Sequence, residues 1–237
     1  MKKQKFIDRW ADHNWLYANI VLGVIMFVVL IWNWNLWDVP QKLMCAMCVI
    51  IPMHNFEEYC FPGGFYFMNN LKVGSKDPML YPQNKLLTVI TNNGAELFLI
   101  VFTLLAPGLE MGVVVFIIAF GYMETMMHLL MGVQMWKRYR PIGKKSIYAP
   151  GLTTCITVFV GISTIGLKWF AGQNFGMGDI VQGIVLLLSF MVPLLLLPLG
   201  VFSKIHLERF RLEGLGYFEI YERKLQELNE SGEAKLK

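Results

Sequence analysis

The chain has 237 residues, of which 55% are hydrophobic and 16% are charged, and its formal net charge is +4. A soluble domain of this size carries about 25% charged residues, and here the charges are gathered into short blocks between long apolar runs. This composition excludes an ordinary soluble domain. The modest positive charge fits anionic lipid headgroups, and we expect no nucleic-acid partner.

Six apolar runs follow one another along the chain, each close to the roughly 20 residues that a helix needs to cross a bilayer. Alternating segments of roughly 10 residues, which are typical of membrane β-barrels, are absent from the sequence. The sequence therefore predicts an all-α, polytopic membrane helical bundle with six transmembrane helices. The predicted spans are residues 15–36, 43–60, 86–106, 111–135, 152–170 and 180–202.

Lys and Arg residues are distributed unevenly between the two sides of this predicted bundle. Nineteen of them fall in the N-terminus, the two longer loops and the tail, whereas the other side holds only Lys42 and Lys168. Because cytoplasmic segments carry the excess of basic residues, this asymmetry predicts an N-in/C-in, multi-pass protein of the cell inner (plasma) membrane. We expect one six-span domain, residues 1–203, and a charged cytoplasmic tail, residues 204–237, with a helix over Tyr217–Asn229.

Ionisable residues inside the predicted spans are concentrated in the second, third and fourth spans. Such residues cost roughly 2.5–3.5 kcal/mol at a helix centre, and they usually face partners or a cavity and carry function. Within each span they are spaced so that they share one helix face. They are His54, Glu57 and Glu58 in the second span, Asn92, Asn93 and Glu96 in the third, and Glu124 and His128 in the fourth.

The depths of these residues agree between the three spans. Counted from the cytoplasmic ends at about 1.5 Å per residue, His54, Asn93 and His128 lie about 9–10 Å deep. On the same count, Glu96 and Glu124 lie at about 15–16 Å, and Glu57 and Glu58 lie nearer the cytoplasm. We therefore expect the polar groups of the three helices to meet.

Imidazole and carboxylate groups form a ligand set suited to a divalent metal ion, with Zn²⁺ or Fe²⁺ the first expectations. The number of groups equals that of ferritin-like di-iron bundles, although the spacing differs, and a single ion with an open position for water is equally compatible. One or two ions are therefore expected. The predicted ligands are His54, Glu57, Glu58, Glu96, Glu124 and His128, and the predicted catalytic residues are Glu57, Glu58 and Asn93.

Glu57 and Glu58 are adjacent and point about 100° apart on a helix, so one of them is open to a supporting role rather than direct ligation. A purely structural hydrogen-bonded network that holds the three helices together is the alternative interpretation of the whole cluster. Cys45 and Cys48 form a C-x-x-C pair, but the helical phase turns the pair away from His54. We interpret these two cysteines as packing residues.

The segment His54-Asn-Phe-Glu57-Glu58-Tyr-Cys-Phe-Pro-Gly-Gly-Phe65 resembles the signature of the H-x-x-E-E-domain family of bacterial integral membrane proteins. The resemblance extends over about residues 15–200. It implies that the cluster is the important site of the chain, and it implies no reaction, because the family has no assigned function.

The first functional hypothesis is a membrane-embedded, metal-dependent enzyme, specifically a hydrolase acting on a lipid-like or amphiphilic substrate from the cytoplasmic side. A di-iron-type membrane oxidoreductase is the second form of this hypothesis. A proton- or cation-coupled transporter that uses buried Glu and His as a relay is the alternative from another class. A structural or regulatory membrane subunit is the third. The expected partners are membrane lipids and the substrate, and an oligomer is possible.

Overall fold

The computed structural model describes residues 6–230, and all regular structure in this part of the chain is helical. The N-terminal lysines of the charge count and residues 231–237 of the predicted tail lie outside the described residues. The long helices are α2 Trp15–Trp32, α3 Val39–Tyr59, α5 Lys85–Leu105, α6 Glu110–Tyr139, α8 Val160–Ala171 and α9 Met177–Met191. The shorter helices are α1 Phe6–Arg9, α4 Phe65–Lys72, α7 Leu152–Thr154, α10 Leu197–Phe202 and α11 Glu219–Glu230.

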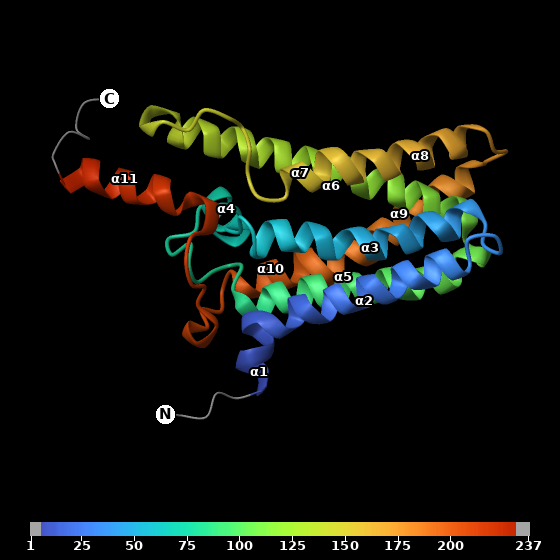
Figure 1. Cartoon of the computed structure of the whole chain (residues 1–237), viewed down its shortest axis with the longest axis horizontal. Coiled ribbons are helices and arrows are strands. Elements are labelled where there is room, and N and C mark those ends of the chain that lie inside the picture. Colours follow the sequence, from blue (N-terminus) through green and yellow to red (C-terminus); the bar gives the residue numbers. More distant parts are fainter. Residues whose placement is uncertain (1–5, 231–237) are drawn as a thin grey trace.

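The long helices alternate in direction along the long axis of the molecule, and α1 and α11 lie at the same end (Figure 1). Helix α2 packs against α3, α3 packs against α5 and α6, and α6 packs against α8 and α9. A π-helical turn, Cys155–Phe159, joins α7 to α8, and another, Val192–Leu196, joins α9 to α10, so that each pair continues as one helical segment. The core between the helices is mostly aliphatic and aromatic, and it contains Phe116, Phe159 and Phe190.

Five helical segments are long and apolar enough to cross a membrane: Trp15–Trp32, Lys85–Gly108, Glu110–Ile142, Leu152–Ala171 and Met177–Phe202. The all-helical prediction is confirmed. The remaining predicted span forms α3, which has the length of a crossing helix but is not among the five. The hydropathy of α3 is lower because this helix carries Gln41, Lys42 and the polar residues of the predicted cluster.

Local sequence signals account for the ends of the helices that build the site. The Asp38 carboxylate accepts a hydrogen bond from the Gln41 backbone N–H at 2.9 Å and begins α3, and Asn84 begins α5 in the same way through Leu87. These contacts satisfy N–H groups that the first helical turn leaves without partners. Helix α3 ends before Gly63 and Gly64, whose φ angles of 70° and 99° favour glycine.

The segment after these glycines folds back onto the chain's C-terminal part. Helix α4 occupies the loop expected at 61–85, and the tail contacts the glycine turn, since the Tyr217 N–H donates to the Gly63 carbonyl at 3.1 Å. Helix α11, Glu219–Glu230, begins two residues after the start of the helix expected in the tail. The tail is therefore packed next to the end of α3 that carries the H-x-x-E-E sequence.

Candidate metal centre

Two facing helices each contribute one imidazole and one carboxylate to a single buried cluster. His54 and Glu58 are four residues apart on α3, and Glu124 and His128 are four residues apart on α6, so each pair shares one helix face. His128 Nε2 lies 3.1 Å from Glu58 Oε1 and 3.3 Å from Glu124 Oε1. His54 Nε2 lies 3.4 Å and 3.7 Å from the same two oxygens.

The four ligand atoms, one from each side chain, all lie within 4.8 Å of one another. Three of the side chains are almost completely buried, with exposed fractions of 5% for His54 and Glu58 and 0% for His128, whereas Glu124 is 24% exposed. The cluster is therefore closed on most sides and accessible beside Glu124. The Cys155 sulfur forms a second compatible set with the two imidazoles.

The outer nitrogens of both imidazoles are held by hydrogen bonds. His128 Nδ1 lies 3.0 Å from the Pro150 carbonyl, which only accepts, so this nitrogen carries the proton. His54 Nδ1 lies 2.8 Å from the Thr154 hydroxyl, which donates its own proton to Glu57 at 2.7 Å and therefore accepts from the ring. With Nδ1 bonded outward in this way, each ring directs Nε2 into the cluster, as metal-binding histidines do.

The inner atoms lie close together without forming directed hydrogen bonds. Among the described residues, His54 Nε2, His128 Nε2 and Glu58 Oε1 are buried and have no hydrogen-bond partner. A buried polar atom without a partner costs about 1–3 kcal/mol, and a shared cation removes that cost for all of them together. The donor set of two imidazoles and two carboxylates fits a divalent transition metal such as zinc or iron.

The walls of the cluster fix the two rings. Phe65 stacks on His128 at a centroid distance of 5.2 Å, and Phe159 meets His54 edge to face at 5.1 Å. Gly151, at a φ of 90°, leaves the space that the His128 ring occupies, because an added Cβ would lie 2.2 Å from His128 Cε1. Backbone, aromatic rings and hydrogen bonds together restrict each imidazole to one orientation.

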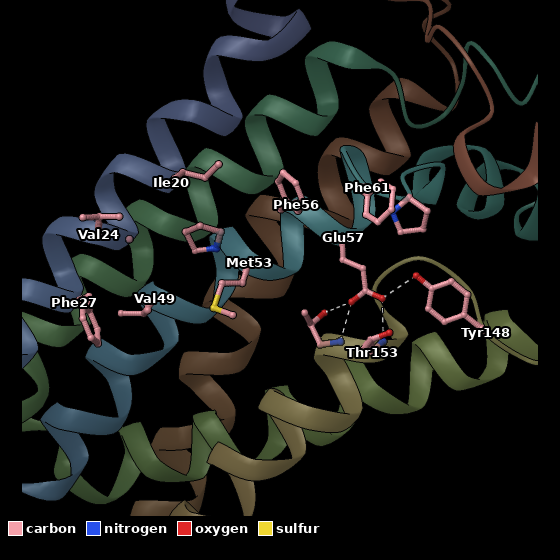
Figure 2. Close-up of a pocket in the computed structure, with 14 residues that line it drawn as sticks. Ile20, Val24, Phe27, Val49, Met53, Phe56, Glu57, Phe61, Tyr148 and Thr153 are labelled. Atoms are coloured by element: carbon pink, nitrogen blue, oxygen red, sulfur yellow. Dashed lines mark hydrogen bonds between the residues drawn. The ribbon is translucent and has the colours of Figure 1, made fainter.

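Glu57 lies beside the cluster and has a different set of partners (Figure 2). Its carboxylate accepts from the Thr153 and Thr154 backbone N–H groups at 3.1 and 2.8 Å and from the Tyr148 hydroxyl at 3.1 Å. These N–H groups belong to the first turn of α7, where a carboxylate is favoured. Glu57 thus holds the helix that supplies Thr154, and Thr154 in turn orients His54.

The structure does not bring Glu96 into the group of converging ligand atoms. Glu96 on α5 is fully buried, and within the described residues neither of its carboxylate oxygens has a hydrogen-bond partner. Cys45 and Cys48 are buried free thiols in the apolar core. Asn93 lines a different cavity, of about 620 Å³, with Tyr17 and Leu22 of α2.

The six predicted ligands therefore separate into three positions in the structure. His54, Glu58, Glu124 and His128 form the cluster, Glu57 supports it, and Glu96 lies outside it. The supporting residues Thr154, Pro150, Gly151 and Phe65 were not predicted from the sequence. Only Phe65 had a signal, since it closes the P-G-G-F part of the motif.

The fold and the cluster define a class: an all-helical protein of membrane type with a buried His/Glu centre between two helices. A family described as proteins of unknown function with an HXXEE motif matches residues 45–165, which is half of the chain and includes every residue of the cluster. The chain belongs to this HXXEE family. No curated protein and no solved structure matches the chain significantly.

Proposed function

We propose that the protein is a membrane-embedded, metal-dependent hydrolase in which His54, His128 and Glu58 hold one divalent ion. The observation that carries the proposal is the convergence of four ligand atoms within 4.8 Å while both Nδ1 atoms are held from outside. Three protein ligands and an open position are the usual arrangement of a catalytic zinc site. A metal bound there supplies a water molecule whose pKa is lowered toward neutrality.

Glu124 is the residue suited to proton transfer. Its side chain is the most exposed of the four, and its carboxylate lies 3.3 Å from His128 Nε2, beside the ligand atoms. A general base must lie within hydrogen-bond reach of the proton that it accepts. Glu124 accepts the proton of the attacking water, and Glu57, which keeps Thr154 and His54 in place, is a positioning residue.

Support for one ion comes from the positions of the other carboxylates. A di-iron centre needs further carboxylates around a second ion. Glu57 is fully engaged with Thr153, Thr154 and Tyr148, and Glu96 lies outside the group of converging atoms. The di-iron oxidoreductase is therefore less well supported than the mononuclear hydrolase.

Support for a lipid-like substrate comes from the surroundings of the site. Helix α6 and the segment that begins with α7, which both border the centre, belong to segments apolar enough to cross a membrane. We place both termini and the cluster at the cytoplasmic side, in the inner membrane, because of the distribution of Lys and Arg. A substrate that enters from this leaflet reaches the cluster without crossing the bilayer.

Purified protein should contain about one equivalent of zinc or iron by elemental analysis. It should hydrolyse at least one amphiphile in a panel of long-chain esters, amides and phosphoesters, and a chelator should stop turnover reversibly. Glu124→Gln should keep the metal and lose turnover, whereas Glu110→Gln, an exposed glutamate at the other end of α6, should change neither. Wild-type protein that contains no metal and takes up a solute into vesicles in a proton-coupled manner would contradict the hydrolase and support the transporter.

A further inference from the structure

An apolar groove lies directly beside the candidate metal centre. It has a volume of about 760 Å³ and runs along α2 and α3 to Glu57 and the start of α7 (Figure 2). Pockets of about 300–1,000 Å³ are the usual size for small-molecule ligands. The groove and the centre share a boundary, because Thr154 lines the groove and also bonds to His54.

One end of the groove is suited to a hydrocarbon chain. Its lining there includes Val24 and Phe27 from α2 and Val49 and Met53 from α3, and α2 is one of the segments that are apolar enough to cross a membrane. Val24 and Phe27 are exposed at the surface of the chain. In a bilayer this surface faces acyl chains, so the occupant of this part of the groove is an acyl or alkyl chain.

The other end of the groove is polar and carries one formal charge. Glu57 lies there among three aromatic residues, Phe56, Phe61 and Tyr148 (Figure 2). The Glu57 carboxylate accepts hydrogen bonds from neutral groups, and no ion pair with a Lys, Arg or His is found for it among the described residues. In the same part of the chain, no Lys, Arg or His lines the groove.

The Glu57 carboxylate, the aromatic rings beside it and the lack of basic lining residues in the described part of the chain together determine which charge the occupant's polar group should carry. A carboxylate beside aromatic rings attracts an ammonium group through its charge and through cation–π contacts. A phosphate or carboxylate headgroup would meet Glu57 without a basic residue to compensate, and such like-charge contacts are unfavourable. Charge complementarity therefore favours a cationic headgroup over an anionic one.

We infer that the groove binds a long-chain amphiphile with an ammonium headgroup, with its chain along Val24 and Met53 and its ammonium group in the groove beside Glu57 and the neighbouring aromatic rings. Binding of this amphiphile is independent of metal chemistry. Its identification as the substrate class of the enzyme rests on the proposed function.

The test is equilibrium binding of two spin-labelled probes, stearyl trimethylammonium and stearyl phosphate, to the full-length protein in neutral dodecyl maltoside micelles. The fraction of immobilised label gives the affinity of each probe. Wild-type protein should bind the ammonium probe at least about tenfold more tightly than the phosphate probe, as expected from one favourable ionic contact. Equal affinities for the two probes would overturn the inference.

Two variants and one control variant locate the bound probe. Glu57→Gln should remove most of the preference for the ammonium probe. Val24→Trp should fill the groove and weaken binding about tenfold, whereas Val21→Trp should not, since Val21 is an equally exposed valine of α2 that lines a different cavity. If both tryptophan variants bind like the wild type, the occupant of this groove is not the probe.

Metal analysis of the same samples separates this inference from the proposed function. A metal-free wild type would contradict the proposed metalloenzyme, and the probe affinities would still test the inference about the groove. The metal-loaded protein could bind the ammonium probe selectively and yet hydrolyse only anionic amphiphiles. That result would overturn the assignment of substrate class.

Discussion

The Thr154 hydroxyl lies 2.8 Å from Nδ1 of His54, and this contact connects the two functions of the H-x-x-E-E sequence. His54 and Glu58 face the centre, and Glu57 faces the first turn of α7, where it holds the helix that carries Thr154. The residue that orients the imidazole is thus positioned by a glutamate three places further along the same motif. This arrangement explains why the motif contains two adjacent carboxylates with different surroundings.

Removing the Thr154 hydroxyl should weaken metal binding without removing a ligand. We expect Thr154→Val to lower the affinity for zinc roughly 10–100-fold, which is the usual effect of losing a hydrogen bond to a metal-binding histidine. Competition with a chelator of known affinity measures the change. The control is Thr157→Val, because the Thr157 hydroxyl donates only to the Thr153 carbonyl within its own helix. Similar losses in both variants would argue against a role for Thr154 in orienting His54.

Separate alanine substitutions of the two adjacent glutamates should have different effects on metal binding and on stability. Glu58→Ala removes a ligand and should abolish stoichiometric metal binding. Glu57→Ala should retain the metal at lower affinity and should destabilise the fold by about 1–3 kcal/mol, because the N–H groups of Thr153 and Thr154 lose their acceptor. Elemental analysis and thermal unfolding measure these effects. A metal-free Glu57→Ala protein that is otherwise folded would indicate that Glu57 is itself a ligand.

A methyl group at Gly151 should displace the His128 ring. Gly151→Ala and Gly143→Ala both place alanine at a positive φ, at 90° and 103°, so both should cost ~1–2 kcal/mol of stability. Only Gly151 lies against His128, whereas nothing lies within 4 Å of a Cβ added at Gly143. We therefore expect Gly151→Ala alone to lose the metal. Metal loss in both variants would mean that backbone strain, rather than the position of His128, is responsible.

Lys144 should make the stability of the protein dependent on pH. Its ammonium group is buried and donates to the Tyr148 carbonyl and the Tyr217 hydroxyl, and burial lowers the pKa of Lys144 from 10.5 to about 8. Below pH 8 the folded protein bears the cost of burying the charge. Between pH 8 and about 10.5 the unfolded chain binds more protons than the folded one, so stability rises with pH. Thermal unfolding at several pH values should show this rise in the wild type and a smaller one in Lys144→Met. Equal slopes would contradict it.

Helical periodicity was sufficient to predict which side chains of the cluster share a face within α3 and within α6. His54 with Glu58 and Glu124 with His128 are each four residues apart, and this spacing determines that they share a face wherever the helix lies. Periodicity does not determine how each helix is rotated relative to its neighbours. Glu96 was assigned to the cluster from its depth and from the helix face that it shares with Asn92 and Asn93, although its carboxylate lies outside the group of converging atoms.

The supporting residues could not be predicted because they come from a non-repetitive segment. Pro150, Gly151 and Thr154 lie at the start of the helix after α6, and they reach the cluster only through the packing of that helix on α3 and α6. Glu57 could be assigned to either role from the sequence, and its contacts with the first turn of α7 favour the supporting role. The number of membrane crossings depended on α3, whose polar residues reduce its hydropathy.

X-ray absorption spectroscopy of the purified, metal-loaded protein tests the central claim most directly. An ion held by His54, His128 and Glu58 predicts only nitrogen and oxygen neighbours at about 2.0–2.2 Å from zinc, with the outer-ring scattering of two imidazoles. Scattering from a sulfur atom at about 2.3 Å would instead indicate Cys155 as a ligand. Protein that binds no metal, or that binds it equally well after His54→Ala and His128→Ala exchanges, would contradict the account.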